Sequence, residues 1–247
     1  MRNKKKQLLI TALATLGVLV LILTVYQSDS GDQFECGVQE VFDIDGNSYK
    51  TVAIGRQCWM AENLRTTKYT DGEDIPRPIS NESWRETGNN KAGAYACYNN
   101  LEENCSVYGA LYNVYAVAEG ICPEGWYVPS DGDWKVLEKE LGMDKDELDL
   151  LYWRGGIATA LSGEAHLWSD PSVGERSNFN ASGFGAVPAG YRLSNGIYSW
   201  LGQRANFWSS TINASGWRRT IAPESSEAVR RTAAAKNIGF SVRCIKE

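Results

Sequence analysis

The longest uninterrupted apolar segment of this chain lies close to its start. Residues 8–26 carry no charge, are mostly apolar and follow the basic sequence MRNKKK. At a rise of about 1.5 Å per residue, this run just spans the roughly 30 Å hydrocarbon core of a bilayer. We therefore predict that residues 1–30 form a signal anchor with a short linker, with the basic end in the cytoplasm. A cleaved signal peptide is the alternative, although Ser28-Asp29-Ser30 is a weak cleavage site.

After this leader, the hydrophobic pattern predicts short elements of both types. Residues 41–54 (VFDIDGNSYKTVAI) form two β-type runs around an Asp-Gly-Asn turn, which predicts a hairpin. Residues 71–94 are rich in turn formers and are expected to form a loop. Apolar residues at helical spacing predict a helix over 106–120. A Ser-x-x-Asp capping box predicts a second helix over 131–141, and a third short helix is expected over 143–153.

The second half of the chain has a less regular pattern. Residues 155–206 are rich in Gly, Ser and Asn, which predicts a long irregular loop. Strands are predicted over 205–212 and 239–246, with another at 218–221. This order of strands, helices, long loop and closing strands is typical of an α+β fold. Residues 31–247 have the length of a single domain.

The charge of the chain is divided unevenly between the leader and the rest. The net charge is −5 at pH 7 over 247 residues, but residues 1–30 hold four of the 25 basic residues and one of the 30 acidic ones. The domain is therefore more acidic than the whole chain. Because an acidic domain lacks the electrostatic footprint of a nucleic-acid binder, nucleic acid is excluded as a partner.

All six cysteines follow the leader, and an exported chain of this kind uses its cysteines as disulfides. The first two flank the 41–54 hairpin at nearly equal distances from its turn, so that folding the hairpin brings them together. The next two bracket a polar loop, and the last two remain to tie the middle of the domain to its C-terminus. Free buried cysteines are the alternative. We predict the disulfides Cys36–Cys58, Cys97–Cys105 and Cys122–Cys244.

No metal or cofactor site is expected. The chain has no CxxC sequence, and its single histidine, His166, cannot build a usual zinc set. The Asp-x-Asp-x-Asn sequence at 43–47 has the opening spacing of a calcium loop. However, Ser48 replaces the required glycine and Ile54 the closing glutamate, so a plain hairpin turn is predicted.

Aromatic side chains are the leading candidates for ligand contact, because the chain has nine Trp and twelve Tyr. Four tryptophans lie within apolar or motif blocks and are expected in the core, namely Trp59, Trp126, Trp134 and Trp208. Other rings occupy polar, Gly-rich segments, where an exposed ring can stack on the face of a sugar. On this basis we predict ligand contacts by Trp168, Tyr198, Trp200 and Trp217. The alternative is that these rings only pin the long loop to the domain.

Six sequence blocks follow one another in the order GNSYKTVAIGRQCWMAENLRTTKY, YGALYNVYAV, CPEGWYVPSDGDW, GFGAVPAGYR, FWSST and GFSVRC. With this succession, which covers residues 38–246, the chain resembles the Fibrobacter succinogenes major paralogous domain family of exported bacterial proteins. More distantly, it resembles the C-type lectin-like fold. That resemblance implies a bridge from a cysteine near the second helix to the C-terminal strand, in agreement with Cys122–Cys244. The calcium-binding tripeptides of C-type lectins are not present.

These expectations together predict a non-catalytic recognition domain of the bacterial cell envelope, with polysaccharide as the leading ligand. The domain would be held outside the cytoplasm by residues 8–26 in the inner membrane, or be secreted if the leader is cleaved. The first alternative is a structural module with an envelope protein as its partner. An enzyme ranks last, because one histidine and bridged cysteines leave few pairs of nucleophile and base.

Overall fold

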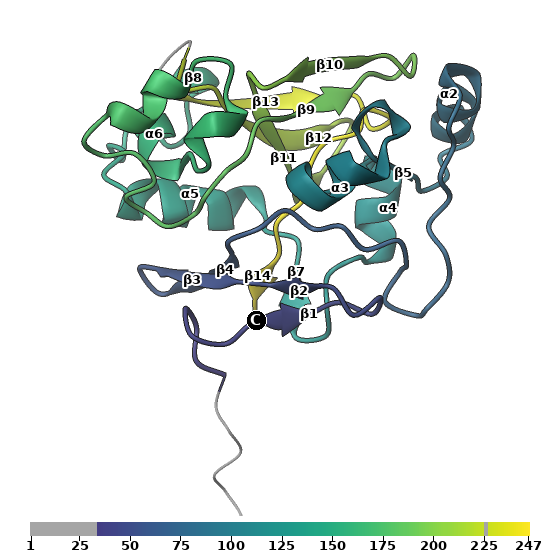
Figure 1. Cartoon of the computed structure of the whole chain (residues 1–247), viewed down its shortest axis with the longest axis horizontal. Coiled ribbons are helices and arrows are strands. Elements are labelled where there is room, and N and C mark those ends of the chain that lie inside the picture. Colours follow the sequence, from purple (N-terminus) through teal and green to yellow (C-terminus); the bar gives the residue numbers. More distant parts are fainter. Residues whose placement is uncertain (1–33, 225–226) are drawn as a thin grey trace, which may run out of the picture. The chain divides into compact units, whose positions relative to one another are not determined.

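The computed structural model describes residues 34–224 and 227–247 (Figure 1). The chain divides into two units, Met1–Glu35 and Cys36–Glu247, and the elements described below belong to the second. The segment 8–26, predicted to be a membrane anchor, lies outside the described residues. Within the described ranges, no helix has both the length and the apolar character needed to span a bilayer.

The predicted N-terminal hairpin is present. Strand β1 (Val41–Phe42) pairs with β2 (Ser48–Tyr49). One carboxylate oxygen of Asp43 accepts hydrogen bonds from the backbone N–H groups of Asp45 and Asn47, at 3.0 and 2.9 Å. The Asp-x-Asp-x-Asn sequence therefore forms the turn of a hairpin, as predicted, and the carboxylate of Asp43 serves to hold that turn.

A four-stranded sheet joins the N-terminal part of the domain to its C-terminus (Figure 1). Its strands are β3 (Thr51–Ile54), β4 (Gln57–Met60), β14 (Ile245–Lys246) and β7 (Trp126–Tyr127), in that spatial order. Strand β14 pairs with both β4 and β7. Of the strand predicted over 239–246, only β14 is regular. The preceding residues form isolated bridges, such as that of Phe240 with Tyr112.

Helix α5 (Asp131–Glu140) confirms the predicted second helix. The Ser130 hydroxyl accepts a hydrogen bond from the backbone N–H of Asp133 at 3.1 Å, and the Asp133 carboxylate accepts one from the N–H of Ser130 at 2.8 Å. This reciprocal capping box explains why the helix begins here. Trp134 and Leu137 are buried on its inner face.

The helix predicted over 106–120 is not continuous, because the chain turns sharply within it and helices cover only its two ends. Gly109 has a φ of 76°, and a Cβ at this position would lie 2.4 Å from the Cβ of Asn63. Only glycine fits such a turn, which the spacing of apolar residues does not register. The region instead consists of η1 (Tyr98–Asn100), α3 (Glu102–Tyr108), β6 (Leu111–Tyr112) and α4 (Val114–Glu119), with β6 paired to β5 (Tyr95–Ala96).

Two further sequence predictions are wrong. The predicted loop over 71–94 contains α2 (Asn81–Asn89), whose capping residue at the third position is Ser83 in place of the usual Glu or Gln. The predicted helix over 143–153 is replaced by turns that lead into strand β8 (Tyr152–Arg154). Here the pairing of β8 with a neighbouring strand outweighs the local helical spacing.

The second four-stranded sheet is antiparallel throughout. Its spatial order is β11-β12-β13-β8, where the new strands are β11 (Ala205–Ile212), β12 (Gly216–Ile221) and β13 (Val229–Ala234). These strands confirm the predictions over 205–212 and 218–221 and add β13.

The predicted irregular loop over 155–206 has two different parts. Its first part is built of short helical turns, namely α6 (Ala158–Leu161), η2 (Ala165–Leu167) and η3 (Pro171–Glu175). Its last part is a hairpin, formed by β9 (Ala189–Arg192) and β10 (Tyr198–Leu201). This hairpin was not expected, and it lies beside β11 (Figure 1).

An aromatic cluster forms the centre of the core. The rings of Trp59, Trp134, Phe184 and Phe207 lie with centroids 5.0–5.7 Å apart. All four tryptophans expected in the core are buried, since none of them is more than 7% exposed. The three predicted disulfides are also present, namely Cys36–Cys58, Cys97–Cys105 and Cys122–Cys244. The domain is thus a disulfide-bonded α+β fold, as the sequence predicts.

Candidate functional site

Strands β12 and β13 each carry two adjacent arginines that point to opposite faces of their sheet. Side chains alternate between the two faces along a strand. Arg219 and Arg231 bond to carboxylates of α5. Arg218 and Arg230, their neighbours in sequence, therefore point to the opposite face. We call the side toward α5 the inner face and the opposite side the outer face.

Carboxylates of α5 pair with the arginines of the inner face. Arg219 donates hydrogen bonds to Asp131 at 2.8 Å and to Glu138 at 2.6 Å, and Arg231 donates one to Asp131 at 2.7 Å. Arg154 of β8 donates a further bond to Glu138 at 2.5 Å. Burial by itself would raise the pKa of Asp131. The hydrogen bond from Arg231 and the charge of Arg219 outweigh burial and hold this pKa below its ordinary value.

The outer face presents a row of polar and aromatic side chains that crosses all four strands. Arg230 lies opposite Trp153 of β8 on one side and opposite Thr220 of β12 on the other, and Thr220 pairs with Asn206 of β11. Arg218 lies in the adjacent row and donates a hydrogen bond to the side-chain oxygen of Asn206 at 2.7 Å. Thr220 and Asn206 are fully buried, so Trp153, Arg230 and Arg218 are the members of these rows that reach the surface.

A third arginine extends this row. Arg204 immediately precedes β11, and both Arg204 and Arg230 lie within electrostatic range of Arg218. The guanidinium carbon of Arg204 lies 3.8 Å from the ring centroid of Trp200. At the other end, the guanidinium carbon of Arg230 lies 5.6 Å from the ring of Tyr152 and 6.0 Å from that of Trp153. We call this set the arginine–aromatic strip: Tyr152, Trp153, Trp200, Arg204, Arg218 and Arg230.

The rings at the two ends of the strip are accessible to solvent. Trp200 is 42% exposed, Trp153 38% and Tyr152 58%. An aromatic ring of this size is usually buried, because burial removes about 150–250 Å² of surface from water. Three exposed rings arranged around three arginines therefore form a surface that is suited to contact with a ligand.

Two of these rings sit on strained backbone. Trp200 has a φ of 67° and Tyr152 a φ of 69°, and they are the only aromatic residues with positive φ in the described ranges. For a bulky side chain this conformation costs on the order of 1–3 kcal/mol. Trp200 lies opposite Gly190, where a Cβ would come within 2.4 Å of the carbonyl oxygen of Ser199. The fold thus tolerates strain at the two positions that place rings at the ends of the strip.

Charge is concentrated at the middle of the strip. Burial lowers the pKa of Arg218 to about 10, and the positive charges of Arg230 and Arg204 add to this effect. The guanidinium nevertheless stays protonated near neutral pH. The strip is therefore a line of three cations with an exposed aromatic ring at each end.

The structure separates the four residues that were predicted to contact a ligand. Trp200 is exposed and belongs to the strip. Trp168 is only 2% exposed, packs in the central core and donates its indole N–H to the carbonyl oxygen of Gly163 at 2.9 Å. The prediction of an exposed ring at Trp168 is therefore wrong. The Gly-rich loop around this residue folds over it, which composition alone does not reveal.

The other two predicted rings are half-buried and hold parts of the domain together. Tyr198 donates a hydrogen bond to the side-chain oxygen of Asn100 at 2.8 Å, and its ring lies 5.1 Å from that of Tyr98. Trp217 lies on the inner face, where the guanidinium carbon of Arg231 is 4.2 Å from its ring. Neither residue belongs to the strip.

The sequence analysis missed five of the six strip residues. The signal was present in the dipeptides Arg218-Arg219 and Arg230-Arg231, because two adjacent arginines in a strand place one cation on each face. The missing information was which face has acidic partners. Tyr152 and Trp153 were assigned to a helix, and Arg204 stood at the edge of a predicted loop.

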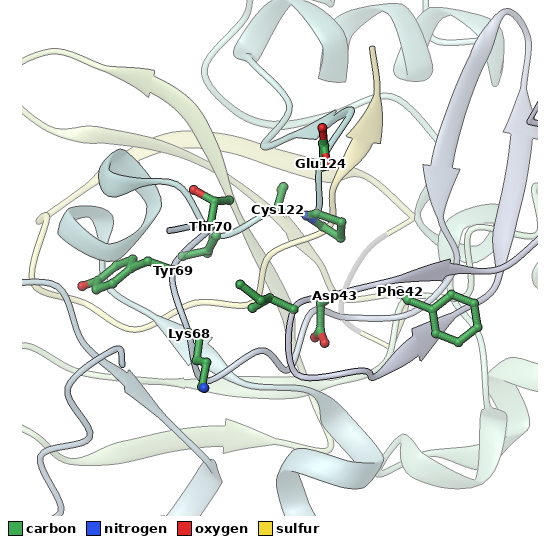
Figure 2. A pocket seen from close by; sticks show the side chains of 10 residues that line it. Phe42, Asp43, Lys68, Tyr69, Thr70, Cys122 and Glu124 are labelled. Carbon is green, nitrogen blue, oxygen red and sulfur yellow. The ribbon is translucent and has the colours of Figure 1, made fainter. Parts of the chain in front are cut away.

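A separate cavity of about 410 Å³ lies beside the N-terminal hairpin (Figure 2). Figure 2 shows Lys68, Tyr69 and Thr70 along one side of this cavity and Phe42 on the other, with Asp43 between them. The carboxylate of Asp43 is already engaged by Asn47 and Tyr49. The main feature of the cavity is therefore its apolar rim, where Phe42 is 60% exposed. The Asp43 carboxylate is not free to bind a ligand.

His166 lines another cavity of about 410 Å³, together with Glu164, Lys50 and Arg65. The His166 imidazole is largely exposed and lies 3.6 Å from the carboxylate of Glu164. Ser162, its neighbour in sequence, is buried and donates its hydroxyl to the backbone carbonyl of Ala158. Within the described ranges, no three or more His, Cys, Asp or Glu side chains gather in an arrangement that could hold a metal ion.

Comparison with known proteins identifies one family. The model of the Fibrobacter succinogenes major domain matches residues 52–246 of the chain. No curated protein and no solved structure matches it.

Proposed function

The chain belongs to the Fibrobacter succinogenes major domain family, and from this premise we propose that it is a non-catalytic recognition domain that binds polysaccharide through the arginine–aromatic strip. The observation that carries this proposal is the exposure of Trp200 on strained backbone at one end of the strip. A rigid ring offers a large contact area at a low cost in conformational entropy. The apolar C–H face of a sugar ring packs on such a surface.

The arrangement of the strip supports an extended ligand. Trp200 marks one end, Trp153 and Tyr152 mark the other, and the three arginines lie between them. A chain of sugar units stacks on the terminal rings while its hydroxyls accept hydrogen bonds from the guanidinium groups. A small ligand would use only one end of such a surface.

We also propose that the domain works outside the cytoplasm at the bacterial cell envelope. Three disulfides support this location, because cytosolic thiols are kept reduced. Tethering through residues 8–26, or secretion after cleavage of the leader, remains part of the same proposal. We also propose that the domain has a C-type lectin-like fold. It is supported by the Cys122–Cys244 bridge and by the C-terminal strand β14 lying beside β4 and β7.

A second candidate function is docking to an envelope protein. It is favoured by the apolar rim of the cavity in Figure 2, where Phe42 and Ile44 are 60% and 51% exposed. Exposed apolar side chains beside a cavity are common at protein interfaces. This rim belongs to the N-terminal hairpin and shares no residue with the strip.

The proposed function is tested by binding of the oxidised full-length chain, purified in non-ionic detergent, to a panel of immobilised plant and bacterial polysaccharides. We expect saturable binding to at least one member. Trp200→Ala should weaken it at least tenfold, because the stacking contact is lost. Phe42→Ala is the control, since it removes another exposed aromatic ring that lies outside the strip. A wild-type chain that binds no polysaccharide of the panel would overturn the proposal, and loss of binding only in Phe42→Ala would move the site to the hairpin.

A further inference from the structure

The three arginines of the strip have no acidic partner in the described part of the chain. Each arginine of the inner face forms an ion pair with Asp131 or Glu138. Arg204, Arg218 and Arg230 take part in none of the ion pairs that the described residues form, and the only side-chain hydrogen bond among them runs from Arg218 to the neutral amide of Asn206. The two faces of one sheet thus differ in whether their arginines have carboxylate partners.

The same arginines carry buried hydrogen-bond donors without acceptors. The Nε–H groups of Arg204, Arg218 and Arg230 are all buried and unpaired among the described residues. A buried donor without an acceptor destabilises the fold, and more so when it is charged. Native structures satisfy almost all of their buried polar groups. The Nε–H of Arg154 is also unpaired, but its guanidinium has a carboxylate partner, which those of the strip lack in the described ranges.

Repulsion between these cations adds to that cost. Arg218 and Arg230 are diagonal neighbours on adjacent strands, since Arg218 pairs with Thr232 and Arg230 with Thr220. The Cα atoms of such diagonal neighbours lie about 7–8 Å apart across the two strands. The charges of Arg204 and Arg230 both act on Arg218. An anion bound at the accessible ends of the guanidinium groups would offset this repulsion.

We infer that the strip is built for an acidic polysaccharide, whose oxyanion groups pair with Arg204, Arg218 and Arg230 while its sugar rings stack on Trp200 and Trp153. This inference rests on the proposed function and names the class of its ligand. Guanidinium groups present planar, paired donors that match a carboxylate or a sulfate. A neutral polysaccharide would leave the three charges uncompensated beneath it.

The rest of the domain is acidic, which disfavours unspecific binding of polyanions. With a net charge of −5, the chain does not attract polyanions in general, so binding has to come from the strip itself. We therefore expect discrimination between acidic polymers that fit the strip and acidic polymers that do not. Duplex DNA serves as the second kind, because it is a stiff polyanion whose phosphates surround stacked bases.

The test compares matched pairs of polymers with the oxidised full-length chain. Polygalacturonate is compared with its carboxyl-reduced form, and dextran sulfate is compared with dextran. We expect each acidic member to bind at least tenfold more tightly than its neutral partner, with an affinity that falls as salt is raised. The first pair tests carboxylate and the second tests sulfate, so the two sources of an oxyanion are distinguished.

Two variants assign the effect to the strip. The double variant Arg204→Gln/Arg230→Gln removes two charges that make no hydrogen bond in the described structure, and it should reduce binding of the acidic polymer at least tenfold. Arg56→Gln is the control, because it removes an exposed arginine from the turn between β3 and β4 and should leave binding unchanged. Thermal unfolding of each variant verifies that the domain remains folded.

The outcomes separate this inference from the proposed function. If neutral polymers bind as tightly as acidic ones and Trp200→Ala still abolishes binding, the proposed function stands and the inference about charge is overturned. Binding of an acidic polymer that is insensitive to the double variant also overturns it. Tighter binding to duplex DNA than to any polysaccharide would overturn both, as would the absence of all binding.

Discussion

At the scale of single residues, the tryptophans of this domain serve two distinct purposes. Most of them fill the core, as Trp59 and Trp134 do in the central aromatic cluster. Trp200 is instead exposed, on strained backbone and in contact with an arginine. The same residue type therefore contributes stability at some positions and a surface for recognition at another, and burial alone separates the two roles.

A comparison of two substitutions makes this difference measurable. Trp168→Ala should destabilise the domain by about 3–5 kcal/mol, because it leaves a cavity in the core. Trp200→Gly should stay within about 1 kcal/mol of the wild type, since the lost contact with Arg204 is offset by relief of the strained backbone. Urea unfolding of the oxidised proteins measures both values. A large loss of stability in Trp200→Gly would mean that this ring is structural.

At the scale of elements, helix α5 and the sheet beside it form one electrostatic unit. Asp131 and Glu138 lie seven residues apart, two turns along the helix, and both face the sheet. They receive Arg154 from β8, Arg219 from β12 and Arg231 from β13. The helix thus supplies carboxylate partners to the arginines of one face of the sheet and none to those of the other face.

This unit predicts how stability depends on pH. The ordinary pKa of an Asp side chain in an unfolded chain is about 3.9. In the folded domain, the pKa of Asp131 lies below that value. A lowered pKa contributes stability that is complete above the unfolded value and is lost as the pH falls through the folded value. We therefore expect the free energy of unfolding to decrease as the pH is lowered from 5 toward 2, as measured by urea unfolding at each pH.

The matched control for this prediction is Asp131→Asn. It should lower stability at pH 7 by about 3–5 kcal/mol, because Arg219 and Arg231 lose a buried partner. It should also flatten the decrease between pH 5 and 2, since the titrating group is gone. A variant that keeps the full slope would show that other carboxyl groups cause the acid sensitivity.

At the scale of the whole domain, the disulfides differ in how much of the chain they enclose. Cys122–Cys244 joins residues 122 positions apart and lies next to the sheet that closes the domain, whereas Cys97–Cys105 spans eight positions. In the chain-entropy model, a longer enclosed loop restricts the unfolded chain more strongly. The long bridge should therefore dominate the contribution of the disulfides to stability.

Paired substitutions test this expectation. Cys122→Ala/Cys244→Ala should cost about 5 kcal/mol of unfolding free energy, whereas Cys97→Ala/Cys105→Ala should cost about 2.5 kcal/mol, because the enclosed loops differ in length. Urea unfolding in the absence of reductant compares the two variants with the wild type. Equal losses would contradict the ranking by loop length.

Features that depend on neighbouring residues could be predicted from the sequence. The hairpin at Asp43–Asn47, the capping box of α5 and the pairing of the six cysteines all follow from local spacing or from what local spacing leaves over. The prediction of one continuous helix over 106–120 failed, because the turn at Gly109 is imposed by the close approach of Asn63, which is distant in sequence. Strand β8 was not predicted for a related reason, since its partner β13 lies more than 70 residues away in the sequence.

The sequence by itself therefore determined the α+β class, the disulfide framework and the family of this chain, because each of these is written in the order and spacing of residues. Only the tertiary structure decided which rings are exposed and which arginines lack a carboxylate. The strip draws on residues 152, 153, 200, 204, 218 and 230, which meet only when the four strands of the second sheet pair and the β9–β10 hairpin lies beside β11. The charge of a surface depends on what packs against its other side, and that is a property of the folded domain alone.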